Sequence, residues 1–401
     1  MTTNNKKYRS KAFLKPASGL ALCTLLLQLS CSPDSKCRIE DLSCTERGLP
    51  AILWVSSCNY RPTCESQTVE APGGSVAFDS SVFADCQRIN IAHGDNANGD
   101  LRFARSNDGG LTWYTTIVDD GSDTGYQSRT FSDKNEVFIS YHDASNANLW
   151  FAYSGNQGLT WRKIQVNSIV DDPGSAADMV VRSPEIWISA QVNNNLTIYY
   201  SNDKGLTWTE SVAVPGPSRG YSPSLVVSGN RFFSLDLESA NSDIYFSRSL
   251  DGGANWSSTL IESTGTVGQY SSLVLINETL VAAYYDATNT RLRFARSSDL
   301  GNTWTVGTID ESANVGTQSD MTTNGSNIYI SYYDATNTAL RVARSRDAGS
   351  TWEVKTLDAG PNVGQFTGIS VAGPGLYVSY RDAGNSALKL SSTAPGCLFS
   401  E

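Results

Sequence analysis

Histidines and closely spaced cysteines are scarce in this chain of 401 residues. His93 and His142 are its only histidines, and no two of its eight cysteines are separated by two residues. Structural zinc sites use closely spaced Cys and His ligands, and a serine-type catalytic triad needs a histidine as its base. The two histidines could bind a metal, but neutral loop side chains are the simpler interpretation. We expect no metal and no other cofactor.

Positive charge is also in deficit. Asp and Glu number 40 against 30 Lys and Arg, which gives a formal net charge of −10. Five of the basic residues fall within residues 1–30, where no acidic residue occurs, so the rest of the chain has a net charge of −15. Nucleic acids bind proteins through Lys and Arg contacts to phosphates. We therefore expect no nucleic-acid partner, and no membrane contact other than a lipid anchor.

A hydrophobic run long enough to cross a bilayer is missing. The apolar run from Gly19 to Leu29 is too short, and it follows a basic stretch. This order is typical of an export signal. The string that ends in Ser30 and Cys31 resembles the cleavage site of bacterial lipoproteins, in which the cysteine takes the lipid. We predict an export signal over residues 1–30, lipidation of Cys31, and a place at the outer membrane or cell surface. Ordinary secretion and an uncleaved anchor are the alternatives.

The main part of the chain is a repeat. The string SNDGGLTW at residues 106–113 returns at 154, 201, 249, 297 and 345, so its starts lie 48, 47, 48, 48 and 48 residues apart. Between these strings, apolar and polar residues alternate with a period of two, and turn-forming residues separate the runs. Each unit is therefore predicted to hold four short strands, A to D. Such units bury both faces when they stack around an axis, which predicts an all-β propeller of four-stranded antiparallel blades.

We call SNDGGLTW and its copies the boxed string. The number of blades follows from the segment that precedes this string in each unit. This segment occurs seven times, from HGDNANGDLRFARS at residue 93 to YRDAGNSALKLSS at 380, and the last copy has no boxed string after it. QTVEAPGG at 67–74 aligns with KTLDAGPN at 355–362, the last strand D and its exit loop. We therefore predict seven blades, with residues 65–70 completing the last one. Residues 31–63 would form a cysteine-containing linker and 64–397 the propeller.

The cysteines after Cys31 number six, an even count in a chain predicted to be exported. Disulfides are therefore expected. The alignment places Cys64 and Cys397 where the seventh boxed turn is missing, and we predict that these two pair. Three pairings remain open for the other four, which are Cys37, Cys44, Cys58 and Cys86.

The boxed string lies between strands C and D, and its residues suit a turn. Its Asp can accept backbone hydrogen bonds, its Gly allows a positive φ, and its Trp begins strand D as an apolar plug. Packing needs the same part in every blade, whereas catalysis needs one special constellation. We expect a structural role for the boxed acids, which are Asp108, Asp203, Asp251, Asp299 and Asp347.

These six strings resemble the Asp-box, or BNR, repeat of the sialidase superfamily, with the pattern S-x-D-x-G-x-T-W, over about residues 65–395. The resemblance implies boxes on the propeller rim, away from the active-site face. Sialidases of this family have an Arg-Ile-Pro motif whose arginine joins two others on a sialic-acid carboxylate. No such motif occurs here, and familiar sialidases have six blades. Because Asp-box propellers include many proteins that are not sialidases, the fold does not settle the function.

If the C–D turns lie on one face, the B–C and D–A connections lie on the other. An acid recurs in the B–C loop of six blades, either as a turn-capping carboxylate or as part of repeated sugar or cation pockets. These acids are Asp95, Asp143, Glu238, Asp286, Asp334 and Asp382.

Departures from the repeat point to a site on this second face. The starts of strand A are expected to line the centre of the ring, and one aligned column there holds Arg129, Asp178, Ser224, Ser272, Asp320 and Gly368. Arg219 and Arg381 lie on nearby loops. Aromatic surface suited to stacking on sugar rings is supplied by Tyr126, Tyr221, Tyr270 and Phe366.

Three functions fit these observations. The preferred one is an exported, lipid-tethered monomer that binds a glycan or a cell-surface protein on its B–C/D–A face. The second is an exo-sialidase-like glycoside hydrolase, in which Arg129, Arg219 and Arg381 grip a carboxylate. Asp178 or Asp320 would then be the general acid, and a Tyr or Glu238 would complete the site. The third is a non-catalytic scaffold in the cell envelope.

Overall fold

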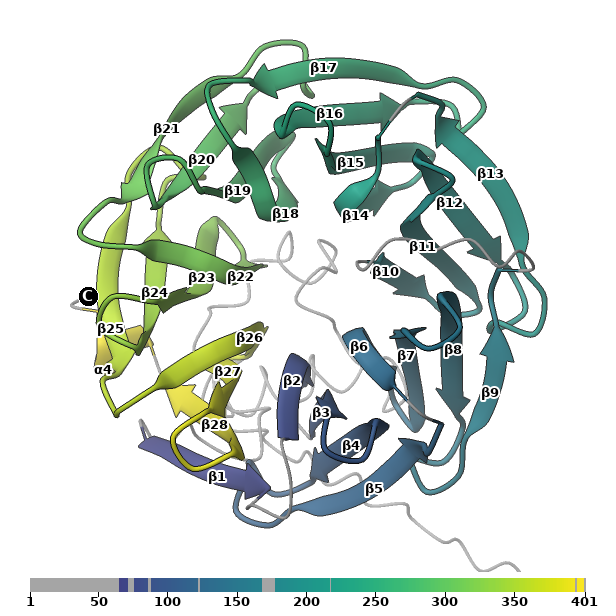
Figure 1. Ribbon diagram of the computed structural model, residues 1–401, viewed down its shortest axis with the longest axis vertical. Coiled ribbons are helices and arrows are strands. Elements are labelled where there is room, and N and C mark those ends of the chain that lie inside the picture. The colour runs from purple at the N-terminus through teal and green to yellow at the C-terminus, as the bar shows by residue number, and fades with distance from the viewer. Residues whose placement is uncertain are drawn as a thin grey trace, which may run out of the picture. The chain divides into compact units, whose positions relative to one another are not determined.

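The computed structural model of this protein describes residues 65–70, 76–85, 88–121, 123–167, 177–216, 218–393 and 395–399. Their strands form seven four-stranded antiparallel sheets, set as blades around a common axis (Figure 1). Strand A of each blade is innermost and strand D outermost. The predicted all-β, seven-bladed propeller is therefore confirmed.

The blades are numbered in chain order, from blade 1 (β2–β5) to blade 7 (β26–β28 with β1). The A strands are β2 (Val76–Ala84), β6 (Thr124–Asp133), β10 (Ala177–Arg182), β14 (Tyr221–Ser228), β18 (Val267–Ile276), β22 (Val315–Asn324) and β26 (Val363–Ala372). The B strands are β3 (Ile89–Asp95), β7 (Glu136–Asp143), β11 (Glu185–Val192), β15 (Arg231–Glu238), β19 (Thr279–Asp286), β23 (Asn327–Asp334) and β27 (Gly375–Asp382).

The outer half of each blade consists of strands C and D. The C strands are β4 (Asp100–Ser106), β8 (Asn148–Ser154), β12 (Asn195–Ser201), β16 (Asp243–Ser249), β20 (Arg291–Ser297), β24 (Ala339–Ser345) and β28 (Ala387–Thr393). The D strands are β5 (Tyr114–Asp119), β9 (Arg162–Gln165), β13 (Thr209–Val214), β17 (Ser257–Glu262), β21 (Thr305–Asp310), β25 (Glu353–Asp358) and, in blade 7, β1 (Glu65–Glu70).

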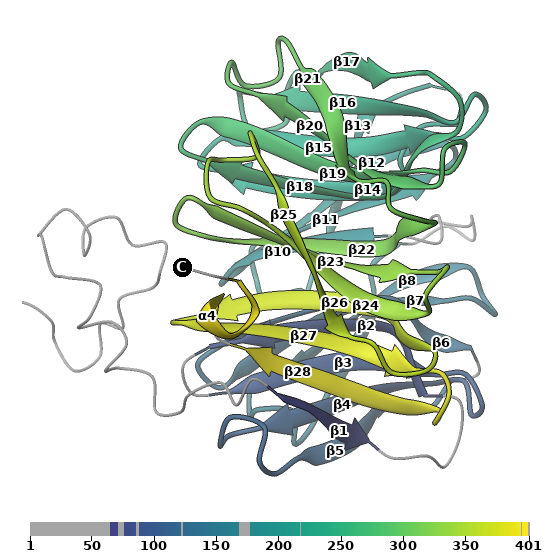
Figure 2. The ribbon, with the colours of Figure 1, turned by 90° about the vertical axis from the view of Figure 1, so that its left-hand side faces the viewer.

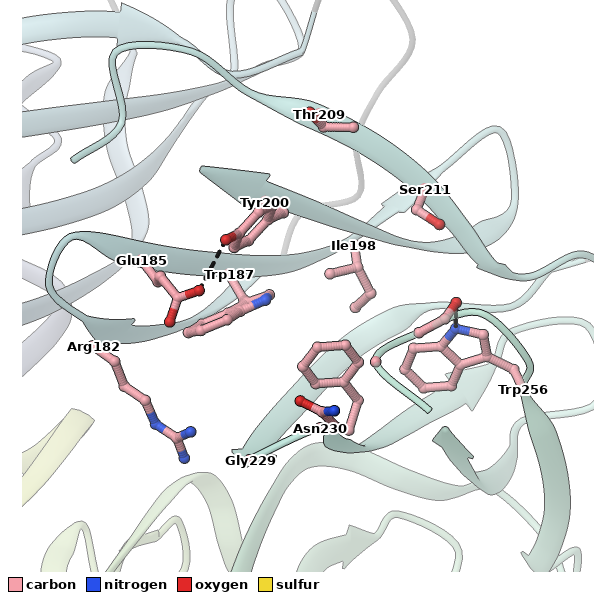
Figure 3. Close-up of a pocket in the computed structure, with 13 residues that line it drawn as sticks. Arg182, Glu185, Trp187, Ile198, Tyr200, Thr209, Ser211, Gly229, Asn230 and Trp256 are labelled. Carbon is pink, nitrogen blue, oxygen red and sulfur yellow. Dashed lines mark hydrogen bonds between the residues drawn. The ribbon is translucent and has the colours of Figure 1, made fainter. Parts of the chain in front are cut away.

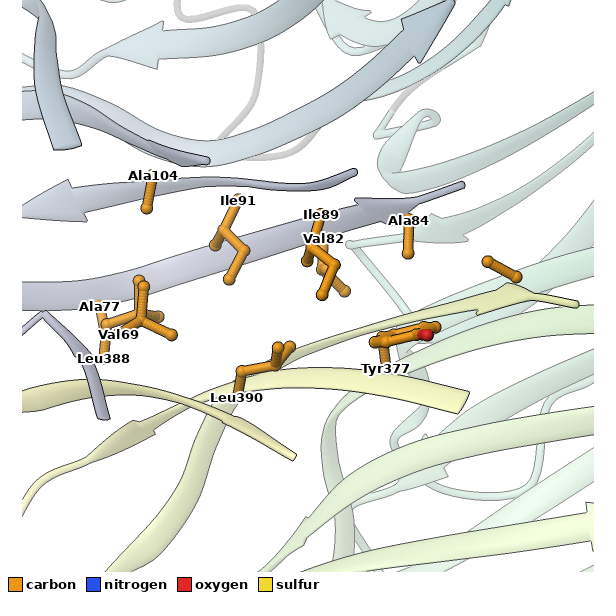
Figure 4. Packing of buried hydrophobic residues seen from close by; sticks show 11 residues of the cluster. Val69, Ala77, Val82, Ala84, Ile89, Ile91, Ala104, Tyr377, Leu388 and Leu390 are labelled. Atoms are coloured by element: carbon orange, nitrogen blue, oxygen red, sulfur yellow. The ribbon is translucent and has the colours of Figure 1, made fainter. Parts of the chain in front are cut away.

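The ring is closed by the N-terminal strand, as predicted. β1 pairs antiparallel with β28, from Glu65 opposite Ser392 to Glu70 opposite Leu388, and lies on the outer side of the last blade (Figure 2). Val69 of β1 packs in one buried cluster with residues of blades 7 and 1 (Figure 4). Joining the first and last segments of the propeller removes two bare sheet edges.

The chain after β28 forms a four-residue helix, α4 (Pro395–Leu398). Cys397 in this helix is disulfide-bonded. Its predicted partner Cys64 lies outside the described residues, as do the lipidation site Cys31 and the signal, so these remain predictions. Within the part of the chain that the structure describes, no helix is long and apolar enough to cross a membrane.

Apolar contacts between neighbouring blades hold the ring together. At several junctions a Phe of strand C packs against the boxed Gly and the boxed Trp of the next blade. Ring centroids lie 5.1 Å apart for Phe103 and Trp161, and 5.0 Å apart for Phe246 and Trp304. A Cβ on Gly301, whose φ is +85°, would overlap the Phe246 ring. The boxed Gly is therefore needed both for its left-handed backbone and for this close approach.

A polar clasp adds to these contacts at five of the seven junctions. An acid at the end of strand D accepts hydrogen bonds from a ring side chain on strand B of the next blade, and pairs with a base of that blade. At the junction of blades 5 and 6, Asp310 accepts from the Tyr332 hydroxyl at 2.7 Å and pairs with Arg341 at 2.8 Å. The other clasps centre on Glu70, Asp119, Glu262 and Asp358. A buried charge is costly unless it is paired. Each clasp therefore stabilises the contact between its two blades.

Candidate functional site

In six blades the start of strand A carries a β-bulge, and these bulges lie around the axis. In six blades the bulge residue is not glycine yet has a positive φ; these residues are Asp79, Gln127, Ser222, Tyr270, Gln318 and Phe366. Hydrogen bonds between blades hold this backbone. The side-chain hydroxyl of the residue that follows the bulge donates to the backbone carbonyl of the bulge residue in the preceding blade. Ser128 donates to Asp79 at 3.0 Å, and Ser80 to Phe366 at 2.7 Å. A conserved backbone thus presents a different side chain in each blade, and strained positions of this kind often serve function.

The predicted charged column lies two residues after the bulge residue along strand A. Asp178 lies 3.4 Å from the Nε of Arg129 and accepts a hydrogen bond from the backbone of Leu225 at 2.8 Å. Asp320 accepts one from the backbone of Ile369 at 3.0 Å. Both acids therefore tie neighbouring blades, and their carboxylates are already engaged.

The charges of this column act on one another. Burial raises the pKa of the Asp320 carboxyl, although Arg129 opposes the shift. Burial alone would lower the pKa of Arg129, but Asp320, Asp178 and Asp79 together raise it. Among the described residues, this group therefore holds three acids and one base, which does not favour an anionic ligand such as a sialic-acid carboxylate.

Two of the predicted catalytic residues lie away from this group. Arg219 is 8% exposed and binds Asp236 through two hydrogen bonds of 2.7 Å, with its guanidinium 4.3 Å from the Tyr245 ring. Glu238 is buried and accepts hydrogen bonds from two backbone N–H groups of its own turn, at 3.1 and 2.9 Å. The predicted grip of three arginines is therefore not assembled, because Arg219 is held inside blade 4.

Arg381 takes part in an aromatic cluster instead. Its guanidinium lies 4.3 Å from the ring of Phe78, which lies 4.9 Å from the ring of Phe366. It also donates to Gln365 at 3.0 Å. Phe78 was missed by the sequence reasoning, although it occupies the repeat position of Tyr126 and Tyr221, and this alignment could have found it.

Tyrosines continue this surface around the ring. Tyr270 is 41% exposed and its ring lies 6.4 Å from that of Tyr285, while Tyr221 is 37% exposed. Tyr126 is partly buried and pairs with His142 across the sheet. Burial and the Asp79 carboxylate raise the pKa of Tyr270, so its hydroxyl stays protonated and can donate. We call Phe78, Tyr221, Tyr270, Phe366 and Arg381 the mouth.

The acids of the B–C loops are satisfied by their own turns. The Asp286 carboxylate accepts from the backbone and the side chain of Asn289, at 3.0 and 2.9 Å. Asp143, Asp334 and Asp382 do the same with the Asn three residues on. Among the described residues, no group of three or more His, Cys, Asp and Glu could hold a metal ion.

The boxed acids are also bound within their own turns. Asp299 accepts from Ser297 and from the backbone and hydroxyl of Thr303, at 2.7, 2.9 and 2.7 Å. These hydrogen bonds lower the pKa of Asp299 to about 2. Asn156 makes the equivalent contacts with Ser154 and Thr160 in its blade. An amide therefore replaces the carboxylate, as a turn role allows.

Known structures with this fold have several functions. The protein titled YCF48 bound to D1 peptide has a TM-score of 0.55 at 16% identity, and the match covers 84% of this chain and 98% of that one. A Hadza microbial sialidase, Hz136, has a TM-score of 0.51 at 14% identity, covering 83% and 69% of the chains. NanB sialidase from Streptococcus pneumoniae, as its K499G mutant, has 0.50 at 11%, covering 83% and 71%.

These likenesses show the fold alone, because the identities are low. No protein-family model matches the sequence, and neither does any curated protein. The chain is thus a propeller similar in fold to sialidases and to a peptide-binding protein, and its function has to be argued from its own residues.

Proposed function

We propose that this chain is an exported, lipid-tethered binding protein that recognises a glycan with its mouth. The observation that carries the proposal is the cluster of Phe78, Phe366 and Arg381, with two exposed tyrosines at the starts of strand A in blades 4 and 5. Aromatic faces suit the apolar faces of sugar rings. The nearby amides of Gln127, Gln318 and Gln365 can exchange hydrogen bonds with hydroxyls.

Catalysis has less support. A sialidase-like mechanism needs a grip on the carboxylate and a free acid, whereas Arg219 is buried against Asp236 and the carboxylates of Asp178 and Asp320 already accept backbone hydrogen bonds. A glycoside hydrolase also needs an acid placed to protonate the leaving oxygen. The alternative of a protein partner is favoured by the likeness to the YCF48 propeller, whose structure contains a bound D1 peptide.

A glycan array probed with the purified chain tests the proposal. We expect glycan signals that fall at least tenfold in Arg381→Ala and in Tyr270→Ala, and that persist in Ser326→Ala, a substitution in an exposed turn between strands A and B. Absence of any mouth-dependent glycan signal would favour the protein partner or a scaffold. Turnover of a fluorogenic sialoside that is abolished by Arg129→Ala and Asp178→Ala would establish the hydrolase instead.

A further inference from the structure

A cavity of about 500 Å³ lies between blades 3 and 4 (Figure 3). Its lining comes from the A–B turns of both blades, strands B to D of blade 3, and strand B and the C–D turn of blade 4. It therefore belongs to the A–B/C–D side of the ring, opposite to the face predicted to bind ligand. Ligand sites in proteins are commonly concave, of this size, and lined by aromatic side chains with a few polar groups.

The cavity exists because one residue departs from the repeat. The strand C position that holds Phe103, Phe151, Phe246 and Phe294 in other blades is Ile198 in blade 3. Ile198 does not reach the boxed Gly of blade 4. The atoms nearest to a Cβ on Gly253 are all in blade 4, beginning with Phe232 at 3.2 Å. Gly253 is accordingly half-exposed, whereas the five other boxed glycines are buried.

At the two other junctions with a smaller residue in this column, a side chain from a terminal part of the propeller lies nearby. In blade 6 the position is Val342, and Phe399 after the last strand belongs to the same buried cluster. In blade 7 it is Leu390, and the side chain of Gln67 on β1 fills the space beside Gly110, where a Cβ would overlap its amide. The chain thus fills the other junctions that lack the Phe, and leaves the junction of blades 3 and 4 unfilled.

Polar ties between the blades are also altered at this junction. In blades 1, 4 and 5 an Arg of strand C donates to a carbonyl of the next boxed turn, as Arg248 does to Leu300 at 2.6 Å. Tyr200 takes this position in blade 3, and its hydroxyl donates to Glu185 at 2.9 Å. The clasp acid is replaced by Val214. Within the described residues, neither the arginine tie nor the clasp is present here.

Four aromatic side chains form one continuous wall of the cavity, and its two halves meet where the rings of Trp187 and Phe232 lie 6.1 Å apart. On the blade 3 side, the rings of Trp187 and Tyr200 lie 5.4 Å apart. On the blade 4 side, Phe232 and Trp256 are stacked at 6.2 Å with an interplanar angle of 18°. Phe232 is the one aromatic residue in its strand B column, where the other blades have Ile, Val or Leu. The same junction that lacks a filling Phe therefore gains an aromatic wall.

The polar lining is small and balanced in charge. Glu185 and Arg182 contribute one charge of each sign, and Arg182 already donates to the carbonyl of Val227. Asn230, Thr209 and Ser211 are exposed and supply an amide and two hydroxyls. These groups can exchange hydrogen bonds with a neutral, hydroxyl-rich ligand.

We propose that this cavity binds a neutral pyranose ring, as the end residue of a glycan. The aromatic wall stacks on one apolar face of the ring, and Glu185, Asn230 and the hydroxyls bind its edge. An acidic sugar is disfavoured because the cavity offers no unmatched positive charge. The site is separate from the mouth, so its existence does not depend on the function proposed above.

Ile198→Phe tests the site by giving blade 3 the residue of its neighbours. The full chain is titrated with methyl α- and β-pyranosides of glucose, galactose, mannose, fucose and N-acetylglucosamine, by calorimetry and by tryptophan fluorescence. We expect at least one to bind the unaltered chain, and Ile198→Phe to weaken that binding at least tenfold with near-UV circular dichroism retained. Asn230→Ala, in an exposed turn, should weaken it severalfold without any change in packing.

Ser326→Ala is the matched control, because Ser326 occupies the turn position of Asn230 in blade 6. It should bind as the unaltered chain does. The proposal is overturned if no neutral pyranoside binds, or if Ile198→Phe and Asn230→Ala both bind at full strength. Binding that is lost in Arg381→Ala and kept in Ile198→Phe would assign the sugar to the mouth, against the cavity.

Discussion

The junction of blades 4 and 5 and the junction of blades 3 and 4 are built from the same repeat but packed differently. In the first, Phe246 fills the space beside Gly301 and Trp304, Arg248 ties the boxed turn, and Glu262 clasps Tyr284. In the second, Ile198 leaves a cavity and the clasp acid is Val214. A ring with most junctions closed can tolerate an open one, and an open junction is where a repeat protein can vary its sequence for a ligand.

Substitution of the boxed glycines should give the largest difference in stability between the two junctions. Gly301→Ala should destabilise the protein by about 4 kcal/mol. The left-handed backbone is unfavourable for alanine, and the new Cβ also overlaps the buried Phe246 ring. In Gly253→Ala the backbone is equally unfavourable, but the nearest atom to the new Cβ is 3.2 Å away, so we expect a loss of stability of about 1–2 kcal/mol. Denaturant unfolding of both variants measures the difference. Equal losses would show that the two junctions are packed alike.

The clasp is the next largest difference. Asp310→Ala removes the shared acceptor of the Tyr332 hydroxyl and the partner of Arg341. Leaving a buried hydroxyl and a mostly buried cation without it should cost about 3 kcal/mol. Tyr332→Phe keeps the ion pair and should cost about 1 kcal/mol. Urea unfolding measures both, and a loss below that of Tyr332→Phe for Asp310→Ala would contradict the clasp.

The fold could be predicted from the sequence because it depends on what the blades share. A seven-fold repeat with a missing last strand leaves one place for residues 65–70, and β1 lies there. Side chains at single positions were harder, because their direction depends on neighbours. Arg219 was placed near the mouth by its loop. Asp236 occupies the position at which four other blades have the clasp Tyr, and the arginine pairs with it inside blade 4.

The cavity was also missed, although its signal is in the sequence. Ile198 in a column of Phe, and Phe232 in a column of aliphatic residues, both depart from the repeat. Each change alone reads as an ordinary core substitution, since one apolar residue replaces another. Only the packing of blade 3 against blade 4 shows that the two residues lie at the same junction.

Filling the cavity should convert the open junction towards the closed one. Ile198→Phe adds apolar contacts beside Gly253 and Trp256, and we expect it to raise the free energy of unfolding by about 1 kcal/mol. Ile198→Val, which removes a methyl group from the same position, should lower it by about 1 kcal/mol. Thermal unfolding of the two variants checks the order. A destabilised Ile198→Phe would mean that the cavity cannot accept the ring that its neighbours hold.

The smallest expected effect is a pH dependence of stability, which comes from the Glu70 clasp between blades 7 and 1. Burial would raise the pKa of Glu70, but His93 and Arg102 outweigh it and lower the pKa below its ordinary value of 4.5. The ionised carboxylate therefore stabilises the fold above that pH, and the contribution is lost as the pH falls through the lowered pKa. Glu70→Gln should be less stable than the unaltered chain at neutral pH, and the difference should shrink as the solution becomes acidic. Unfolding free energies across this range test it, with Glu65→Gln on the exposed end of the same strand as the control. A constant difference at every pH would show that Glu70 closes the ring through packing and not through its charge.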